Sequence, residues 1–99
     1  MVFGEGLILT PGQAIAWRAP PLDRLEEGDL APLLALDPAP EFLLLGTGAA
    51  LARPRPALVA ALDRRGIGIE PMDSRAAARA WGLLRGEGRQ IAAALLPLA

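Results

Sequence analysis

Residues 42–70, FLLLGTGAALARPRPALVAALDRRGIGIE, decide the fold of this 99-residue chain. The first four residues are apolar without alternation, which predicts a strand that is buried on both faces. Residues 54–65 predict a helix, because prolines mark its start and Gly66 follows its apolar stripe. Residues 67–70 predict a second strand. This strand–helix–strand order predicts a right-handed crossover between two parallel strands.

The N-terminal part of the chain contains shorter segments. Two apolar stretches on either side of Pro11-Gly12 predict a small hairpin. Consecutive prolines favour a surface loop over residues 18–28, and Asp29 is placed to cap a short helix over residues 30–36. This part is therefore expected to add two strands and one short helix.

The C-terminal part continues the alternation of helix and strand. Asp73 or Ser74 begins a helix that runs to about Leu84, and residues 91–96 predict the last strand. The whole pattern predicts a single α/β domain over residues 1–99, with a mixed sheet covered by helices. Its mixed central sheet is expected to have about five strands, with a βαβ crossover and an N-terminal hairpin.

The composition excludes several classes of site. Cys, His, Lys, Tyr and Asn are all absent, so all ten basic residues are Arg. The usual ligands of zinc, copper and haem are missing, as are Ser-His and Cys-His nucleophile pairs and a Schiff-base lysine. We therefore expect no metal, no cofactor and no catalytic residue. The net charge of -1 also argues against a nucleic-acid-binding protein.

The apolar stretches of the chain are short. The longest one without charge covers residues 42–52, which is well below the roughly 20 residues of a membrane span. The first basic residue is Arg18, so the start does not resemble a secretory signal. These features predict a cytoplasmic protein without a transmembrane segment.

A candidate ligand site follows from the order of the strands. The loops after parallel strands lie side by side, and here they carry Gly46, Thr47, Gly48, Asp73 and Ser74. The second loop also begins a helix, whose free N–H groups attract anions. These residues therefore predict a small-anion or nucleotide site. The alternative stays open that the glycines form a tight turn and that Asp73 only caps its helix.

Other polar residues add weaker candidates. Arg75 and Arg79 share one helix face and are able to grip a carboxylate or a phosphate, or they form a solvated face. The carboxylates of Glu70, Asp73 and Glu87 provide a further candidate, acid–base chemistry in a hydrolase.

The two tryptophans receive different assignments. Trp81 has helical spacing with Ala77 and Leu84 and is expected in the core. Trp17 lies near Pro20 and Pro21 and is expected to be partly exposed, as an anchor for protein contact.

Three separated motifs resemble a known family. They are PEFLLLGTG at residues 40–48, GIGIEPMDS at 66–74 and EGRQIAAAL at 87–95. In this order they resemble a domain-of-unknown-function family that includes the mitochondrial respiratory complex I assembly factor 3 and small bacterial and archaeal proteins. The resemblance implies a three-layer α/β fold, no established enzyme activity and, for the mitochondrial relatives, a role in assembling a membrane complex.

The chain departs from this family in the last helix. The family commonly has Arg-Thr-Tyr-Asn where this sequence has Arg79-Ala80-Trp81-Gly82. Thr47, Asp73 and Arg79 are left as the best polar candidates for a site.

The leading functional hypothesis is a non-catalytic protein-binding or assembly module, with a membrane complex as its candidate target. It implies one or more protein partners, and the high apolar fraction also makes a homo-oligomer plausible. The alternative is a small-anion or nucleotide-binding protein that uses the loops at residues 46–48 and 71–74.

Overall fold

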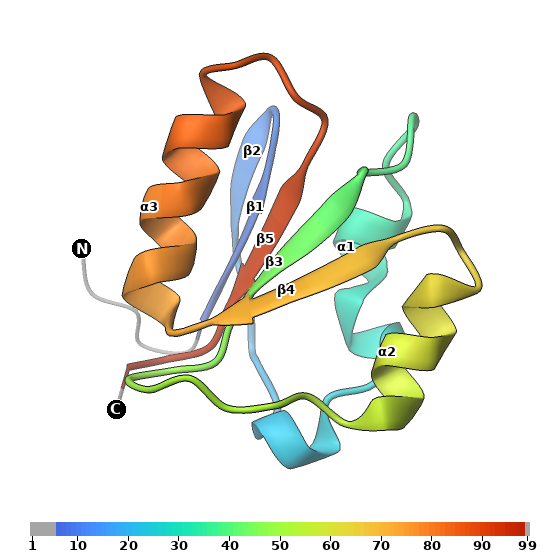
Figure 1. Ribbon diagram of the computed structural model, residues 1–99, viewed down its shortest axis with the longest axis vertical. Coiled ribbons are helices and arrows are strands. Elements are labelled where there is room, and N and C mark those ends of the chain that lie inside the picture. Colours follow the sequence, from blue (N-terminus) through green and yellow to red (C-terminus); the bar gives the residue numbers. More distant parts are fainter. Residues whose placement is uncertain (1–5, 99) are drawn as a thin grey trace.

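The computed structural model describes residues 6–98. A five-stranded mixed sheet forms the middle layer, in the order β2-β1-β5-β3-β4. Helix α3 lies on one face of this sheet, and α1 and α2 lie on the other (Figure 1). The predicted fold class is confirmed. The elements are β1 (Leu7–Thr10), β2 (Gln13–Ala16), the 3-10 helices η1 (Leu22–Arg24) and η2 (Glu27–Leu30), α1 (Ala31–Leu34), β3 (Phe42–Gly46), α2 (Pro56–Asp63), β4 (Gly68–Met72), α3 (Ser74–Arg85) and β5 (Ala92–Leu95).

The directions of the strands follow from the connections between them. β1 pairs antiparallel with β2 through the hairpin and antiparallel with β5. β3 pairs parallel with both β4 and β5, because α2 and α3 provide the crossovers. The carboxyl ends of β3 and β4 therefore meet at one edge of the sheet, as the sequence predicts.

The core occupies both faces of the sheet. Leu43, Leu44 and Leu45 of β3 are all buried, which confirms a strand covered on both sides. In β5 the buried side chains Ala92, Ala93 and Ala94 are small, and small side chains allow helices to approach a central strand closely.

Helix α2 begins two residues later than predicted. Arg55 precedes Pro56 and has extended backbone angles, φ -60° and ψ 137°. A residue before proline is disfavoured in the helical region, so Pro54 stays outside the helix and Pro56 takes the first helical position. Gly66 ends this unit with a positive φ of 78°.

The segment expected as a surface loop contributes one residue to the core. Residues 18–28 contain η1 and the start of η2, and Leu25 and Leu30 are fully buried. Leu25 is the one buried residue between positions 18 and 28, so this segment lies at the surface as predicted. Its 3-10 turns and the burial of Leu25 were not predicted, because an isolated apolar residue has no periodicity. Asp29 also caps a different element: its Oδ2 accepts a hydrogen bond from the N–H of Glu26 at 2.9 Å, before η2. The helix expected over residues 30–36 is reduced to α1 (Ala31–Leu34).

The expected exposure of Trp17 is wrong. Its side chain is 7 % exposed and belongs to the core beneath the 3-10 segment. The indole N–H donates to the backbone oxygen of Asp29 at 3.0 Å. A tryptophan buried in this way offers little surface to a partner. Trp17 instead packs in the core and links β2 to η2 through its hydrogen bond to Asp29.

Candidate functional site

The structure brings five of the predicted site residues together. They lie where β3 and β4 end, and two of them, Gly48 and Ser74, are hydrogen-bonded to each other. The N–H of Ser74 donates to the oxygen of Gly48 at 2.8 Å, and the N–H of Gly48 donates to Ser74 Oγ at 2.9 Å. Ser74 is fully buried, and its hydroxyl donates to the oxygen of Leu96 at 2.8 Å. Ser74 therefore connects the β3 loop, the start of α3 and the end of β5.

Gly46 allows this close arrangement. A Cβ atom on Gly46 would lie 2.8 Å from both Cα and Oγ of Ser74, closer than Cβ atoms are found in real structures. Gly48 has a positive φ of 103°, a conformation that favours glycine. The close packing at Gly46 and the positive φ at Gly48 therefore explain why glycine stands at both positions, without any ligand.

Thr47 and Asp73 also bond internally. Thr47 Oγ1 lies 2.7 Å from the oxygen of Ala50 and accepts from the N–H of Ala52 at 3.0 Å. Asp73 Oδ1 accepts from the N–H of Ala76 at 2.9 Å, which makes Asp73 the N-cap of α3. These bonds occupy N–H groups that an anion would need. Anion binding at this loop stays a prediction, and its geometry favours the turn-and-cap alternative.

Arg79 lies outside this group of residues. It is an exposed residue of α3, six positions after Asp73. At 1.5 Å per residue this separation corresponds to about 9 Å along the helix. Arg79 is therefore a surface arginine whose role stays untested.

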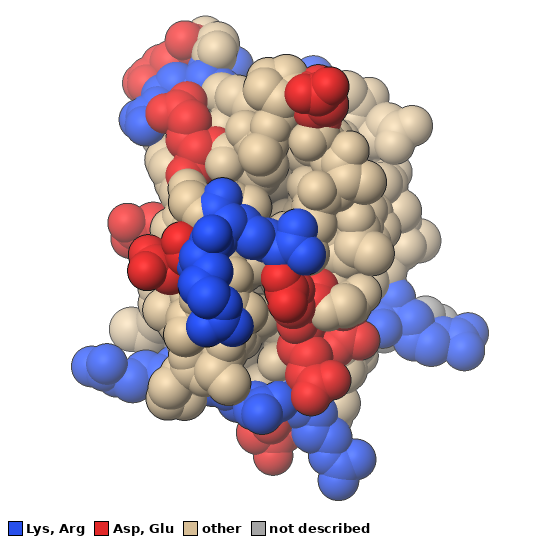
Figure 2. All heavy atoms as spheres, turned by 90° about the vertical axis from the view of Figure 1, so that its right-hand side faces the viewer, with Lys and Arg blue, Asp and Glu red and all other residues tan. Residues whose placement is uncertain are grey.

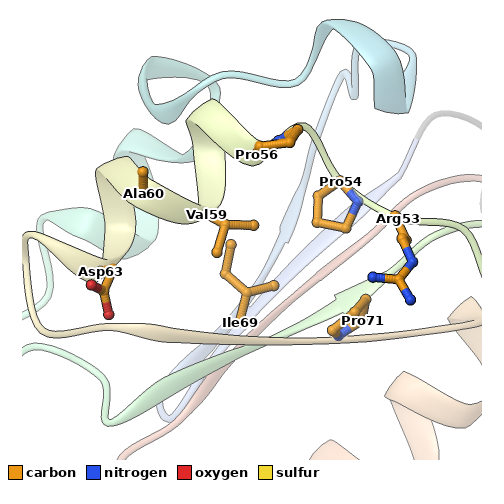
Figure 3. A pocket seen from close by; sticks show the side chains of 8 residues that line it. All are labelled: Arg53, Pro54, Pro56, Val59, Ala60, Asp63, Ile69 and Pro71. Carbon is orange, nitrogen blue, oxygen red and sulfur yellow. The ribbon is translucent and has the colours of Figure 1, made fainter.

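A larger concave site lies between α2 and β4. It is a groove of about 460 Å³, within the usual range for binding pockets, and Figure 3 shows the side chains that face it. Most of its lining is apolar, and Arg53 and Asp63 stand near its opposite ends (Figure 3). On the α2 side the groove exposes Val59, of which 41 % is accessible. The groove is lined by Arg53, Pro54, Pro56, Val59, Ala60, Asp63, Ile69 and Pro71.

The groove runs along the edge strand β4, whose free backbone edge lacks one hydrogen-bond donor. The N–H of Thr47 donates to the oxygen of Met72 at 2.8 Å, so the backbone groups of Met72 face β3. In a parallel pair, the backbone N–H and C=O groups of successive residues point alternately toward and away from the neighbouring strand. The backbone groups of Ile69 and Pro71 therefore point to the free edge of β4, where Pro71 has no N–H. An added strand would lack a donor at that position.

This groove was not predicted from the sequence. The loop expected at residues 71–74 includes the end of β4, so Pro71 belongs to a strand. A proline within a strand is a signal of a sheet edge.

The surface beside α2 mixes charges of both signs. Figure 2 shows this side of the molecule, with acidic and basic side chains next to one another and an uncharged area beside them. Two ion pairs contribute, Arg55 with Glu26 at 3.3 Å and Arg65 with Glu27. Exposed pairs of this kind add little stability. On the face shown, no single-sign patch suggests a nucleic-acid surface.

Two other kinds of feature are absent from the part of the chain that the structure describes. No helix among residues 6–98 has the length and apolar character needed to span a bilayer. Within the same residues, no group of three or more acidic, His or Cys side chains is placed to hold a metal ion.

Known proteins similar to this chain are consistent with one family. An uncharacterised protein of Rhodobacter capsulatus is 43 % identical over 70 residues, which covers 71 % of this chain and 56 % of that protein. The NADH dehydrogenase [ubiquinone] 1 alpha subcomplex assembly factor 3 of Danio rerio is 33 % identical over 96 residues, covering 97 % of this chain and 55 % of that protein. The chain thus spans about half the length of the curated relatives it matches.

A solved structure and a family model agree with these relatives. The NMR structure of a Xanthomonas campestris protein has a TM-score of 0.82 and 37 % identity, covering 95 % of this chain and 70 % of that one. The model of the family described as protein of unknown function (DUF498/DUF598) matches residues 1–96. Because this match includes nearly the whole sequence, the chain belongs to the DUF498/DUF598 family.

Proposed function

We propose that this protein is a non-catalytic assembly module that binds an apolar segment of a partner protein in the groove between α2 and β4. The observation that carries the proposal is the groove itself, with its apolar lining along an edge strand and one charged residue near each end. The curated relatives named as assembly factors support a protein as the ligand. By analogy with them, a subunit of a membrane complex is the partner that we propose.

The groove recognises side chains rather than backbone. Pro71 removes a donor from the outer edge of β4, so strand addition would be weakened there. Pro56 and Val59, which are both exposed, instead offer apolar surface at the groove. Binding by such a surface gains from the area removed from water, about 25 cal/mol per Å² before the costs of association.

The charged residues near the ends give the bound segment a direction. Arg53 favours an acidic residue at one end, and Asp63 favours a basic residue at the other. The proposed ligand is therefore a short apolar segment with an acidic residue toward Arg53 and a basic residue toward Asp63. The remaining polar chemistry of the chain, with no His, Cys or Lys, does not suggest a reaction at this groove.

The proposal is tested by a matched pair of variants. Val59→Asp places a charge in the groove, and Leu83→Asp places the same charge on α3, where Leu83 is 73 % exposed. Both proteins are tagged, expressed in the native cells and captured with detergent-solubilised membranes, and partners are quantified by mass spectrometry. Unfolding midpoints are measured first to establish that both variants are folded.

We expect Val59→Asp to lose at least about tenfold of a specific partner, which corresponds to about 1.4 kcal/mol, whereas Leu83→Asp retains it. Arg53→Glu is expected to reduce capture of the same partner, because the acidic end of its segment is then repelled. Equal recovery of every partner by Val59→Asp and Leu83→Asp would rule out the groove as the binding site.

A further inference from the structure

We propose that the free edge of β2 pairs with β2 of a second copy of this chain, in antiparallel register about Ile15, so that one sheet runs through a symmetric dimer. This inference concerns the other end of the sheet from the α2–β4 groove and does not rest on the proposed function.

The hydrogen-bond pattern of the hairpin identifies the free groups of β2. The N–H of Trp17 donates to the oxygen of Gly6 at 3.2 Å, so these two residues form a hydrogen-bonded pair. In an antiparallel ladder such pairs alternate with non-hydrogen-bonded pairs. Ile8 and Ile15 are therefore hydrogen-bonded to each other, and the backbone groups of Ala14 and Ala16 face away from β1.

This edge is open to solvent. β2 is the terminal strand of the sheet among the described residues, and Gln13, Ala14 and Ala16 are exposed. Strand edges are commonly protected by charged residues, by proline or by bulges. None of these devices occurs within β2, whose sequence is QAIA. The opposite edge differs, because Pro71 is placed on β4.

The edge of β2 is complementary to itself. A two-fold axis at Ile15 places Ala14 opposite Ala16 of the second copy, and the same pair recurs on the other side of the axis. Because both alanines direct N–H and C=O outward, every outward donor meets an outward acceptor. Such an isologous arrangement is the commonest way for a chain to form a dimer.

The side chains also permit this register. Ile15 would lie opposite its own copy as a non-hydrogen-bonded pair, in which Cβ atoms approach to about 4.5–5.5 Å. Ile15 is only partly buried in the monomer, so this contact would cover its remaining apolar surface. Arg18 would lie opposite Gly12, so no like charges face each other across the axis.

A four-residue strand forms a small interface, so the dimer is expected to be weak. Sedimentation equilibrium from about 10 μM to about 1 mM covers the range of such interfaces. We expect the average mass to rise from 10.3 kDa toward twice that value across this range. In the same series, the amides of Ala14 and Ala16 should gain protection from hydrogen exchange.

Charge pairs at the two exposed alanines test the register itself. Ala14→Glu combined with Ala16→Glu places carboxylates opposite each other across the axis, and should raise the dissociation constant at least about tenfold. Ala14→Glu combined with Ala16→Lys places opposite charges across the axis, and should dimerise at least as well as the unchanged protein. Ala49→Glu with Ala50→Glu, in an exposed loop, controls for net charge and should have little effect.

Two results would overturn the proposed dimer. A mass of 10.3 kDa at every concentration would overturn the proposal. A dimer that responds equally to the Glu-Glu and Glu-Lys combinations would overturn it too, since the copies would then meet through another surface. Neither result bears on whether a single partner segment binds in the α2–β4 groove, which is tested by the Val59→Asp comparison.

Discussion

Replacing Ser74 by alanine tests whether the predicted site loop is held together for structural reasons. The substitution removes one oxygen atom from a fully buried position. That atom accepts from the N–H of Gly48 at 2.9 Å and donates to the oxygen of Leu96 at 2.8 Å. Both backbone groups would be left inside the protein without this partner.

The expected cost follows from the two groups left behind. A buried donor or acceptor that loses its partner costs about 1–3 kcal/mol. For the N–H of Gly48 and the oxygen of Leu96 together this gives a loss of about 2–6 kcal/mol in the free energy of unfolding. A domain of this size loses about 4–8 °C in Tm for each kcal/mol, so Tm should fall by at least about 8 °C. A total stability of about 5–15 kcal/mol leaves the variant folded through most of this range.

The assay is urea unfolding followed by circular dichroism, with a thermal scan of the same samples. Arg75→Ala is the matched control, because Arg75 is the next residue of α3 and is exposed. It should change the free energy of unfolding by less than about 0.5 kcal/mol. A loss below about 1 kcal/mol for Ser74→Ala would refute the reasoning, since the two hydrogen bonds would then contribute no more than one average bond.

Further predictions concern the two tryptophans and the anion hypothesis. Trp17→Phe removes the indole bond to the Asp29 oxygen and should cost about 1–2 kcal/mol by urea unfolding. Trp81→Phe should change stability by less than about 1 kcal/mol, because the buried indole N–H of Trp81 has no partner among the described residues. A larger loss of stability for Trp81→Phe than for Trp17→Phe would contradict both expectations. A phosphate titration followed by NMR should leave the amide signals of Thr47 and Ser74 unmoved at millimolar concentrations, since the Ser74 N–H and the Thr47 N–H are already bonded. Saturable shifts of both signals would restore the anion site.

The order of strands and helices was predictable because local signals mark most of the boundaries. Pro11-Gly12 makes the hairpin turn, Gly66 ends the α2 unit, and Asp73 caps α3. Each of these residues acts through its own backbone conformation or its nearest neighbours. Such signals depend on a few neighbouring residues, so they can be identified without knowing the tertiary structure.

The parts that were not predictable depend on distant residues. Trp17 beside Pro20 was expected to be partly exposed, but it is covered because its indole bonds the Asp29 oxygen, twelve residues away. Leu25 and Leu30 belong to the same buried cluster as Trp17, although neither leucine is part of a periodic pattern in the sequence. The groove required the knowledge that β4 is an edge strand, and strand order is a tertiary property. The loop residues were found correctly as neighbours, yet their internal hydrogen bonds were not visible in the sequence.

The two proposals place different kinds of recognition at the two ends of the sheet. At β4 the backbone edge is interrupted by Pro71, while the side-chain groove beside it is open. At β2 the backbone edge is open and the strand carries no charge. Because β2 and β4 are the outermost strands, a dimer through β2 would leave both α2–β4 grooves at the far ends of the joined sheet. A dimer would then present two grooves to a partner complex, and a tethered second site raises apparent affinity without new contacts. If both proposals hold, the Glu-Glu combination at residues 14 and 16 should weaken capture of a multimeric partner while leaving binding of a single isolated partner segment unchanged.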